Sequence, residues 1–437
     1  MRSAHFLLTT FGSLGDLHPY IAVGLGLRAR GHTVTIGTSE AYREKIESEG
    51  LRFHPIRPDF GAAFRPEILR QAMHPRKGTE FVFRKLMLPS FEQSFEDTRA
   101  AASDADLLVG HPIAFATPTV AELLRKPWVS VALQPSVFLS EHDPLTVSGV
   151  PLISWLMSRS PGFNRAFIRF ARGVMHRWGA PVNAYRKKLG LRELRNPLLD
   201  GMFSPHGTQG WFSRVMARPQ PDWPPQVEIT GFPFYDKLEP GHGLSAELAR
   251  FLEGGTAPVV FTLGSSVVFN PGGFYRESLT AVRRLGCRAI MLLGRDTGNT
   301  LESVPDNVLI ADYAPYSELL PRAAATVHQG GVGTTAQALR SGKPMIVVPW
   351  SHDQPDNGRR MQNLGVGRVI ARRQYRADRV VRELETILRT PAYTEAARAT
   401  SREMEREDGV AAACNGLIRA VLAGQRPGPD ALNRGEV

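Results

Sequence analysis

The chain has 437 residues, enough for two domains of ordinary size, each with its own hydrophobic core. Its hydrophobic content of 42% and charged content of 22% are those of globular proteins and argue against a disordered chain. The formal net charge of +11 indicates an anionic partner, such as nucleotide phosphates or an acidic membrane surface. Nucleic acid ranks last, because the sequence has neither paired Cys/His ligands nor an RNA-binding aromatic signature.

Only two cysteines are present, Cys287 and Cys414, and neither has a partner at metal-ligand spacing. A disulfide framework is therefore not expected, and a reducing compartment fits. The amino-terminal stretch has too short an apolar core for a secretory signal, and no apolar run approaches the ~18 residues needed to span a bilayer. We expect a cytoplasmic protein that is soluble or peripheral to the inner membrane face.

The first predicted element is a βαβ unit that opens a Rossmann-like domain. It consists of a buried strand at 5–10, a turn with Gly12 and Gly15, a helix at 19–29 and a second strand at 33–37. Because the turn has only two glycines and no acidic residue closes the second strand, the pattern gives little support to a nicotinamide cofactor.

Asp16 is the candidate for acid–base chemistry in this turn, because it follows the carboxyl end of the first strand. A carboxylate positioned there can remove the proton of a substrate hydroxyl. The alternative is a helix-capping carboxylate, and the two roles are compatible. His18 is the reserve candidate for the base; for this residue, packing on the start of the helix is the favoured alternative.

Two further candidates follow strands of the same domain. Buried strands are predicted at 51–56, 107–109 and 129–133, and the segment 58–89 is predicted to be irregular. His111 follows the second of these strands, and Gln134 follows the third. Both side chains reach one cleft if the sheet is parallel, and each is equally well explained as a hydrogen-bonding loop residue.

Residues 154–195 alternate aromatic with basic side chains and contain almost no acid. Amphipathic basic helices of this kind lie on anionic membranes or admit lipidic acceptors. The favoured alternative is an ordinary helical excursion with its apolar side on the domain core, since the net charge of +11 spreads arginine widely.

A proline-rich stretch at 219–225, PQPDWPP, predicts a stiff connection between two domains. We assign an amino-terminal Rossmann-like domain to 1–218, a linker to 219–240, a second Rossmann-like domain to 241–400, and a returning helix with a tail to 401–437. Strands of the second domain are predicted at 259–263, 289–293 and 308–310. Ser265 and Ser266 follow the first of them. Their hydroxyls and amides are expected to reach the same anion as the glycine loop at 330–333.

The most informative stretch is ATVHQGGVGTTAQALRSGKPMIVVPWSHDQPDN at 325–357. It predicts a buried strand at 325–327, a glycine loop, a helix at 334–341 and a second buried strand at 345–348. Glycines expose amide N–H groups, and a helix amino terminus favours an anion. These features predict a phosphate site formed by Gly330, Gly331, Gly333 and Thr334, with the His328 imidazole as a further donor.

Asp353 and Gln354 lie in the loop after the second strand. Together they offer acceptors and donors to neighbouring hydroxyl groups, which is how a sugar ring is recognised. A diphosphate site beside a sugar site indicates a nucleotide sugar.

These residues carry a family resemblance. His328, the glycine run, Asp353-Gln354 and Asn357 resemble the donor-binding box of nucleotide-sugar-dependent glycosyltransferases, the superfamily of plant and bacterial small-molecule enzymes with the GT-B fold. DYAP at 312–315 resembles the start of that box, which implies that Tyr313 stacks on the nucleotide base and that main-chain atoms at Ala314 read it. GSLGDLHP at 12–19 resembles the family's amino-terminal motif, with Asp16 in the position of the base.

The resemblance implies an α/β protein of the GT-B fold, with two Rossmann-like domains facing each other across a cleft. The donor binds to the second domain and the acceptor to the first. The implied reaction is an inverting transfer without a bound metal or cofactor, the nucleotide diphosphate sugar being a co-substrate. Asp104 and Asp106 mimic a metal-binding motif, but their position ahead of a strand argues against one. The family's ribose-binding acid is missing, and Gln337 is expected to bind the ribose instead.

The Asp-Gln pair favours UDP-glucose as the donor, because the family usually combines this pair with glucose. Stretches such as HDQPDN also resemble the bacterial rhamnosyltransferases that join a deoxysugar to a hydroxy-fatty acid. This likeness makes thymidine-diphosphate rhamnose the second donor and a hydroxy-fatty acid the acceptor that goes with it. The expected acceptor class is a hydrophobic alcohol or phenol. A nucleotide-sugar epimerase and a noncatalytic nucleotide-binding subunit stay open as alternatives of other classes.

Overall fold

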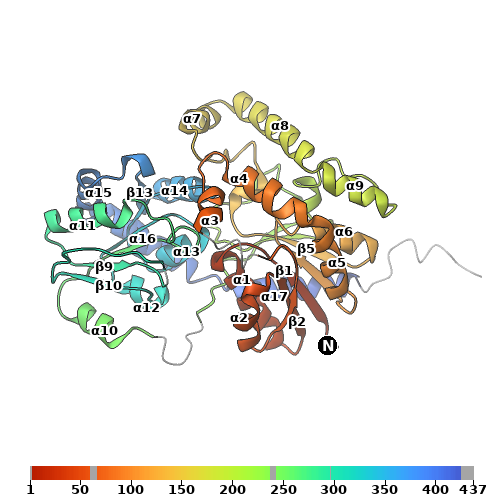
Figure 1. The fold of residues 1–437 in the computed structure, drawn as a ribbon, viewed down its shortest axis with the longest axis horizontal. Coiled ribbons are helices and arrows are strands. Elements are labelled where there is room, and N and C mark those ends of the chain that lie inside the picture. The colour runs from red at the N-terminus through yellow and green to blue at the C-terminus, as the bar shows by residue number, and fades with distance from the viewer. Residues whose placement is uncertain (1, 60–65, 237–242, 296, 425–437) are drawn as a thin grey trace, which may run out of the picture.

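The computed structural model describes residues 2–59, 66–236, 243–295 and 297–424, which form two parallel α/β domains side by side (Figure 1). Within these residues the first sheet has seven strands, in the order β3-β2-β1-β4-β5-β6-β7. They are β1 (His5–Thr9), β2 (Thr33–Thr38), β3 (Arg52–Pro55), β4 (Leu107–Gly110), β5 (Trp128–Ala132), β6 (Thr208–Gly210) and β7 (Val227–Ile229).

The second sheet has six strands in the described residues, in the order β10-β9-β8-β11-β12-β13. They are β8 (Val259–Thr262), β9 (Ala289–Leu292), β10 (Val308–Ala311), β11 (Ala325–His328), β12 (Met345–Val347) and β13 (Gly367–Val369). The paired strands of both sheets are parallel. The carboxyl ends of each sheet's strands therefore share one edge. The GT-B architecture predicted from the sequence is confirmed.

Helices connect the strands and cover the sheets. The first domain contains α1 (Leu14–Arg28), α2 (Arg43–Ser48), α3 (Pro66–Ala72), α4 (Gly78–Phe81), α5 (Phe91–Ala101), α6 (Ala116–Leu123), α7 (Pro151–Arg159), α8 (Pro161–Trp178) and α9 (Ala180–Lys188). The later part of the chain contains α10 (Ala246–Glu253), α11 (Phe274–Leu285), α12 (Tyr316–Leu319), α13 (Val332–Arg340), α14 (Gln354–Asn363), α15 (Ala377–Arg389), α16 (Pro391–Met404) and α17 (Gly409–Gly424).

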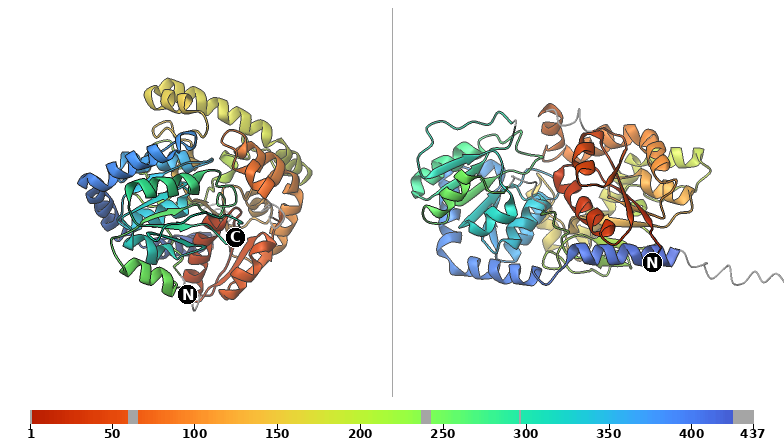
Figure 2. Two further views of the ribbon diagram at one scale, coloured as in Figure 1. Left: turned by 60° about the vertical axis from the view of Figure 1, so that its left-hand side comes forward. Right: turned by 90° about the horizontal axis from the view of Figure 1, so that it is seen from below.

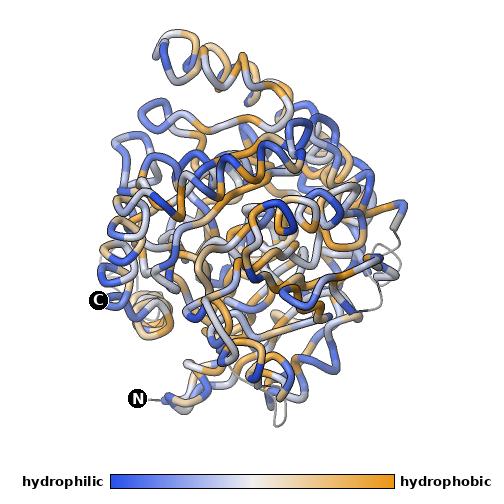
Figure 3. The backbone as a smooth tube through the Cα atoms, turned by 90° about the vertical axis from the view of Figure 1, so that its left-hand side faces the viewer, coloured by the Kyte–Doolittle hydropathy of each residue, from blue (hydrophilic) through white to orange (hydrophobic). Residues whose placement is uncertain are grey.

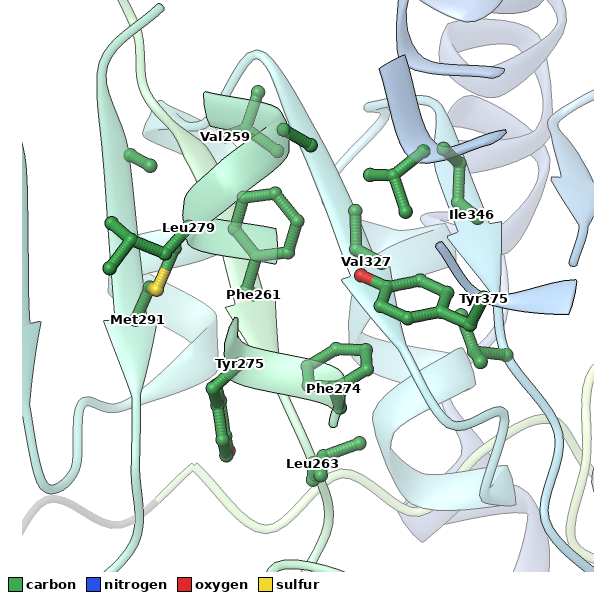
Figure 4. Packing of buried hydrophobic residues seen from close by; sticks show 14 of the residues in the cluster. Val259, Phe261, Leu263, Phe274, Tyr275, Leu279, Met291, Val327, Ile346 and Tyr375 are labelled. Atoms are coloured by element: carbon green, nitrogen blue, oxygen red, sulfur yellow. The ribbon is translucent and has the colours of Figure 1, made fainter. Parts of the chain in front are cut away.

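The core of the second domain explains why its strands are apolar along their whole length. Helices cover both faces of a parallel sheet, so both sets of alternating side chains are buried. Phe261 and Val327, from neighbouring strands, belong to one buried cluster with Phe274 and Tyr375 (Figure 4). The stacked rings of Phe274 and Tyr375 have centroids 4.9 Å apart. Burying each such side chain contributes about 1.5–3 kcal/mol to stability.

The chain crosses between the domains twice. β7 lies within the predicted linker 219–240 and pairs with β6, so the linker prediction is wrong over these residues, which belong to the first sheet. The last helix, α17, returns to the first domain, where Cys414 and Leu417 join the core and Gln209 Nε2 donates to Ala413 O at 3.1 Å. Figure 2 shows α16 and α17, in blue, along one side of both domains.

Three predicted boundaries need correction. α1 begins at Leu14 instead of Pro19, because Ser13 and Asp16 form a capping box that satisfies the first amides of the helix. α13 begins at Val332, so Gly333 lies in its first turn instead of in a loop. The segment 58–89, predicted to be irregular, contains α3 and α4 in its described part.

Candidate active site

The first turns of α1 and α13 meet between the two sheets and define the candidate site. A Cβ atom placed on Gly333 would lie only 3.6 Å from the Cα atom of Gly15. Since β1 leads into α1 and β11 leads into α13, both turns follow the carboxyl end of a strand inside its sheet. This edge is where open parallel sheets bind ligands.

Asp16 uses its two carboxylate oxygens in different ways. Oδ2 accepts from Ser13 N at 2.7 Å and from Ser13 Oγ at 3.1 Å, which fixes the start of α1. Oδ1 lies 3.6 Å from Nε2 of His111, and 29% of the Asp16 side chain is exposed. The capping role and a role as base are therefore compatible, because they use different oxygens.

His111, predicted as an acceptor-binding residue, lies at the end of β4 and is nearly buried. Its Nδ1 is 3.4 Å from Ile113 N, which donates to it. Nε2 of His111 is the ring nitrogen that faces the Asp16 carboxylate, at a distance longer than a hydrogen bond, so the two side chains are neighbours at the ends of β1 and β4.

His18, the reserve base, lies on another side of α1. Its ring packs on the ring of Tyr235, with centroids 5.0 Å apart. Burial, and next the positive charge of Lys45, lower its pKa to about 4, so the imidazole is neutral at neutral pH. His18 occupies a packing position, as the favoured alternative had it.

Gly330 and Gly331 form the turn that leads from β11 into α13. Gly330 has a φ of +91°, and a Cβ atom there would lie 2.5 Å from Val347 Cγ1 and 3.1 Å from Gln354 O. Only glycine fits such a position without strain. Gly331 is the N-cap, so Val332, Gly333 and Thr334 form the first turn of α13. The amide N–H groups of a first turn have no hydrogen-bond acceptor within the helix. This turn is suited to bind an anion.

The side chain of His328 does not face this turn from the cleft. It is completely buried; its Nδ1 accepts from Gly330 N at 3.1 Å and its Nε2 lies 3.4 Å from Met345 Sδ. Burial lowers its pKa to about 3, which keeps the ring neutral. His328 supports the glycine turn from within the domain, and the predicted donation to an anion does not match its placement.

Gln329 takes the place that the sequence analysis assigned to His328. It follows His328 at the end of an extended strand, where successive side chains point to opposite sides. Its Nε2 would collide with a Cβ atom on Gly264 and would lie 2.9 Å from one on Gly331, so its amide sits between the two glycine loops. Its Oε1 is buried and has no hydrogen-bond partner among the described residues. The alternation along the strand was the signal that could have identified it.

Asp353 and Gln354 belong to a loop that is held by hydrogen bonds. Gln354 Oε1 accepts from Trp350 N at 2.8 Å and Ser351 N at 3.2 Å, so its amide nitrogen is the group left to face a sugar. Asp353 Oδ2 accepts from Asn357 Nδ2 at 2.6 Å. Burial, and next the negative charge of Asp16, raise the pKa of Asp353 to about 7. Asp353 therefore lies close enough to Asp16 for their charges to interact.

The remaining predicted donor residues differ in their exposure. Ser265 and Ser266 form a half-buried turn after β8. Tyr313 is 55% exposed, and the Arg295 guanidinium lies 5.2 Å from its ring centroid. Ala314 is buried. An exposed aromatic ring at the edge of the sheet is available for stacking on a planar base.

Gln337 and Gln134 lie farther from the glycine turn. Gln337 Nε2 is 3.4 Å from Asp236 Oδ1, in the connection between the domains, and its Oε1 is buried without a partner among the described residues. Gln134 follows β5 and precedes a short 3-10 helix, Pro135–Phe138. Within the described residues, no hydrogen bond or ion pair joins either amide to Asp16, His111 or Asp353.

First-domain segments cover the loop between β12 and α14, residues 348–353, which we call the sugar loop because the sequence analysis assigned sugar binding to it. His352 Nε2 lies 2.9 Å from Ala72 O, and Ser351 Oγ donates to His74 O at 3.2 Å. Arg360, nearly buried, pairs with Asp143 of the first domain at 2.7 Å. These contacts join the loop after β12 to the opposite domain, so a bound sugar would be enclosed between the two.

The described residues contain no group of three or more His, Cys, Asp or Glu side chains that could hold a metal ion. The mimic of a metal-binding motif lies at the other end of the first sheet, where Asp106 Oδ2 accepts from the amide of His5, the first residue of β1.

Comparison with known proteins gives the family. Residues 6–126 match the model of the glycosyltransferase family 28 N-terminal domain, and residues 276–414 match that of the erythromycin biosynthesis protein CIII-like C-terminal domain. Over 431 residues the chain is 33% identical to the O-mycaminosyltylonolide 6-deoxyallosyltransferase of Streptomyces fradiae, covering 93% of this chain and 95% of that protein. The chain belongs to the GT-B glycosyltransferases.

More distant relatives extend this result. A sterol 3-beta-glucosyltransferase of Arabidopsis thaliana is 28% identical over 386 residues, a match that covers 82% of this glycosyltransferase but only 56% of the plant protein. Among solved structures, a calicheamicin glycosyltransferase superposes with a TM-score of 0.73 at 17% identity, over 98% of this chain and 100% of that one. A spinosyn rhamnosyltransferase complexed with thymidine diphosphate gives 0.64 at 18% identity, over 96% and 100%. These two structures support the fold.

Proposed function

We propose that this glycosyltransferase moves a sugar from a nucleotide diphosphate to a hydroxyl group of a hydrophobic small molecule, with inversion and with Asp16 as general base. The observation that carries the proposal is the placement of Asp16. Its Oδ1 faces His111 at the meeting point of α1 and α13, while its other oxygen caps α1. A carboxylate so placed lies between an acceptor on the first domain and a donor on the second.

In the proposed reaction, the acceptor oxygen attacks the anomeric carbon of the sugar from the side opposite the diphosphate. The acceptor proton passes to Asp16 Oδ1, and the bond between the anomeric carbon and the phosphate oxygen breaks. The negative charge that develops on the diphosphate is met by the first-turn amides of α13 and by the Gln329 amide. Because bond formation and cleavage occur on opposite faces, the anomeric configuration inverts.

A thymidine diphosphate deoxysugar is the donor that the combined observations favour. The Streptomyces relative is named for a deoxysugar, and its similarity spans nearly the whole chain. In addition, Ala336 and Gln337 occupy the region where the family's ribose-binding acid is expected, and Gln337 contacts Asp236. A deoxyribose has one hydroxyl fewer to bind. The absence of the acid therefore lowers the affinity for a thymidine nucleotide less than the affinity for a uridine nucleotide.

UDP-glucose is the second donor. The Asp353-Gln354 pair and the sterol glucosyltransferase relatives favour it. These relatives and the Streptomyces enzyme are named for bulky, largely apolar acceptors, which supports a hydrophobic alcohol as the acceptor class. Transfer without a bound metal belongs to the proposal, because helix amides are placed to meet the leaving-group charge.

The proposal is tested by mass spectrometry of purified protein incubated, with and without EDTA, with lipophilic alcohols and either thymidine-diphosphate rhamnose or UDP-glucose. A glycosylated acceptor formed in the presence of EDTA supports metal-independent transfer and identifies the donor. Isomerised sugar without any transfer would point to an epimerase, and an untouched donor would favour a noncatalytic subunit. Loss of transfer when EDTA is added would contradict the metal-independent part.

A further inference from the structure

α7 and α8 concentrate exposed apolar side chains. Leu152 and Trp155 in α7 are 67% and 54% exposed, and Phe163 and Phe170 in α8 are 36% and 69% exposed. Together they are four of the seven exposed large apolar residues in the described part of the chain. Single exposed apolar residues are ordinary, whereas a cluster marks a contact surface. We call the exposed side of these two helices the α7–α8 face.

The arrangement on α8 separates the exposed phenylalanines from three of the arginines. Phe163, Phe170 and Arg177 follow each other at seven-residue spacing and share one side of the helix, while Arg165, Arg169 and Arg172 lie on another side, at least ~100° away from the two phenylalanines around the helix axis. Of the 18 residues of α8, only Asn164 and Ile168 are buried. Figures 2 and 3 show this helix at the periphery of the molecule. The favoured sequence interpretation, with the apolar side on the core, therefore fails for much of α8.

The charge of this region has a single sign over a long stretch. Residues 144–192 contain no Asp or Glu, and they contain nine basic residues: Arg159, Arg165, Arg169, Arg172, Arg177, Arg186, Lys187, Lys188 and Arg192. Arg172 pairs with Asp200, and Arg165 lies 3.9 Å from Glu141. Within the described residues no ion pair involves Arg159, Arg169 or Arg177. A surface of this composition complements a negatively charged one.

A groove of about 710 Å³ continues the α7–α8 face at the end of α8. Arg84 and Arg177 line it together with the apolar side chains of Leu88, Pro89 and Trp178. Arg84 also pairs with Glu80, whereas no ion pair in the described residues involves Arg177, so a guanidinium group beside apolar walls is left to match the phosphate of a lipid headgroup and the beginning of its acyl chains.

The α7–α8 face is also tied to the candidate active site. Arg76 Nε donates to Gly149 O at 3.0 Å, directly before α7. Two residues earlier, His74 O accepts from Ser351 Oγ in the sugar loop. A surface that docks through α7 therefore lies beside the segment that covers the site.

We propose that the α7–α8 face docks on an anionic phospholipid bilayer. Trp155 and Phe170 would enter the boundary between headgroups and acyl chains, and the arginines would contact lipid phosphates. No helix in the described residues has the length and apolar content to cross a bilayer, which restricts the contact to the interface. Docking in this way places the interdomain site next to lipophilic acceptors dissolved in the membrane.

The test is cosedimentation of the full chain with vesicles of phosphatidylcholine, with and without phosphatidylglycerol, in the absence of donor and acceptor. Binding should require phosphatidylglycerol and should weaken as salt is added. The double variant Trp155→Ser/Phe170→Ser should bind more weakly by roughly tenfold or more, because two large apolar side chains leave the contact. Arg169→Glu should weaken binding by roughly tenfold through charge reversal.

The matched control lies on α15, in the other domain. Leu388→Ser/Arg382→Glu removes an exposed apolar residue and reverses an exposed charge, and it should bind vesicles like the wild type. If the double variant on the α7–α8 face does not fold, Arg169→Glu still tests the proposal, because Arg169 is exposed. Equal vesicle binding by wild type and Arg169→Glu, or binding lost in the α15 control as well, would overturn it.

Two further outcomes separate this proposal from others. A lipid-free dimer that is lost in Trp155→Ser/Phe170→Ser would assign the face to a second copy of the chain and overturn membrane docking. Transfer to a water-soluble acceptor should be unchanged in Arg169→Glu. Since vesicle binding is measured without substrates, it tests docking even if the proposed transfer activity is refuted.

Discussion

The substitution Asp16→Asn separates the two roles of this residue. An asparagine keeps the size of the side chain and an oxygen that can accept from Ser13 N, but its amide cannot take a proton at neutral pH. We expect kcat to fall by roughly 10²–10⁴-fold, the usual contribution of a positioned general base. Donor affinity, measured by calorimetry with the nucleotide diphosphate alone, should change by less than about threefold, because the leaving-group site does not depend on proton transfer.

The structural part of the effect can be worked out separately. Asp16→Asn removes a negative charge from the first turn of α1, which is worth about 0.3–1 kcal/mol of stability. Ser13→Ala removes the side-chain cap of the same helix and costs about 1 kcal/mol, while it leaves the carboxylate in place. Urea denaturation of both variants should therefore show similar, small losses in the free energy of unfolding.

The two variants should differ in activity and resemble each other in stability. Ser13→Ala should keep kcat within about tenfold of the wild type. An Asp16→Asn enzyme that keeps more than a tenth of wild-type kcat would refute the assignment of the base. Equal losses of kcat in Asp16→Asn and Ser13→Ala would show that helix capping, and not proton transfer, accounts for the effect.

Three other predictions concern the second domain. Gln329→Ala should lower kcat by roughly 10²-fold if its amide meets the leaving group, whereas His328→Ala should mainly lower the melting temperature; steady-state kinetics and thermal melts distinguish them. Gly330→Ala should cost about 1–3 kcal/mol in urea denaturation, because of its positive φ and the close Val347 methyl group. Asp353 has a folded pKa raised to about 7, so the free energy of unfolding should fall as pH rises from about 4 to about 7, and Asp353→Asn should flatten that dependence.

The sequence predicted the fold well because the GT-B sheets are built from long buried runs. Stretches such as 6–9 and 259–262 are apolar or small throughout, and glycine and serine follow in the turns after them. Such runs identify a parallel strand without tertiary information. The strands β6, β7 and β13 have three residues each, which is too short for any periodicity. Their pairing depends on neighbours far away in the chain.

The loops of the candidate site follow from the sequence, and the structure corrects the placement of one side chain among them, that of His328. A strand alternates its side chains, so a shift of one residue between His328 and Gln329 exchanges a buried packing residue for one that faces the glycine turn. The partnership of Asp16 and His111 was also outside the reach of the sequence. Those residues are 95 positions apart, and only the parallel pairing of β1 with β4 brings them together.

The charges of Asp16 and Asp353 give a physical reason for the donor to bind before the acceptor reacts. The charge of Asp16 contributes to the raised pKa of Asp353, so the two carboxylates repel each other across the site. This repulsion is weakest when hydrogen-bond donors surround the Asp353 carboxyl group. Sugar hydroxyls that donate to Asp353 would offset this repulsion. The contact of Arg360 in α14 with Asp143 joins the helix that follows the sugar loop to the first domain. In the proposed reaction, donor binding on the second domain therefore reduces the negative charge that faces Asp16, the proposed base on the first.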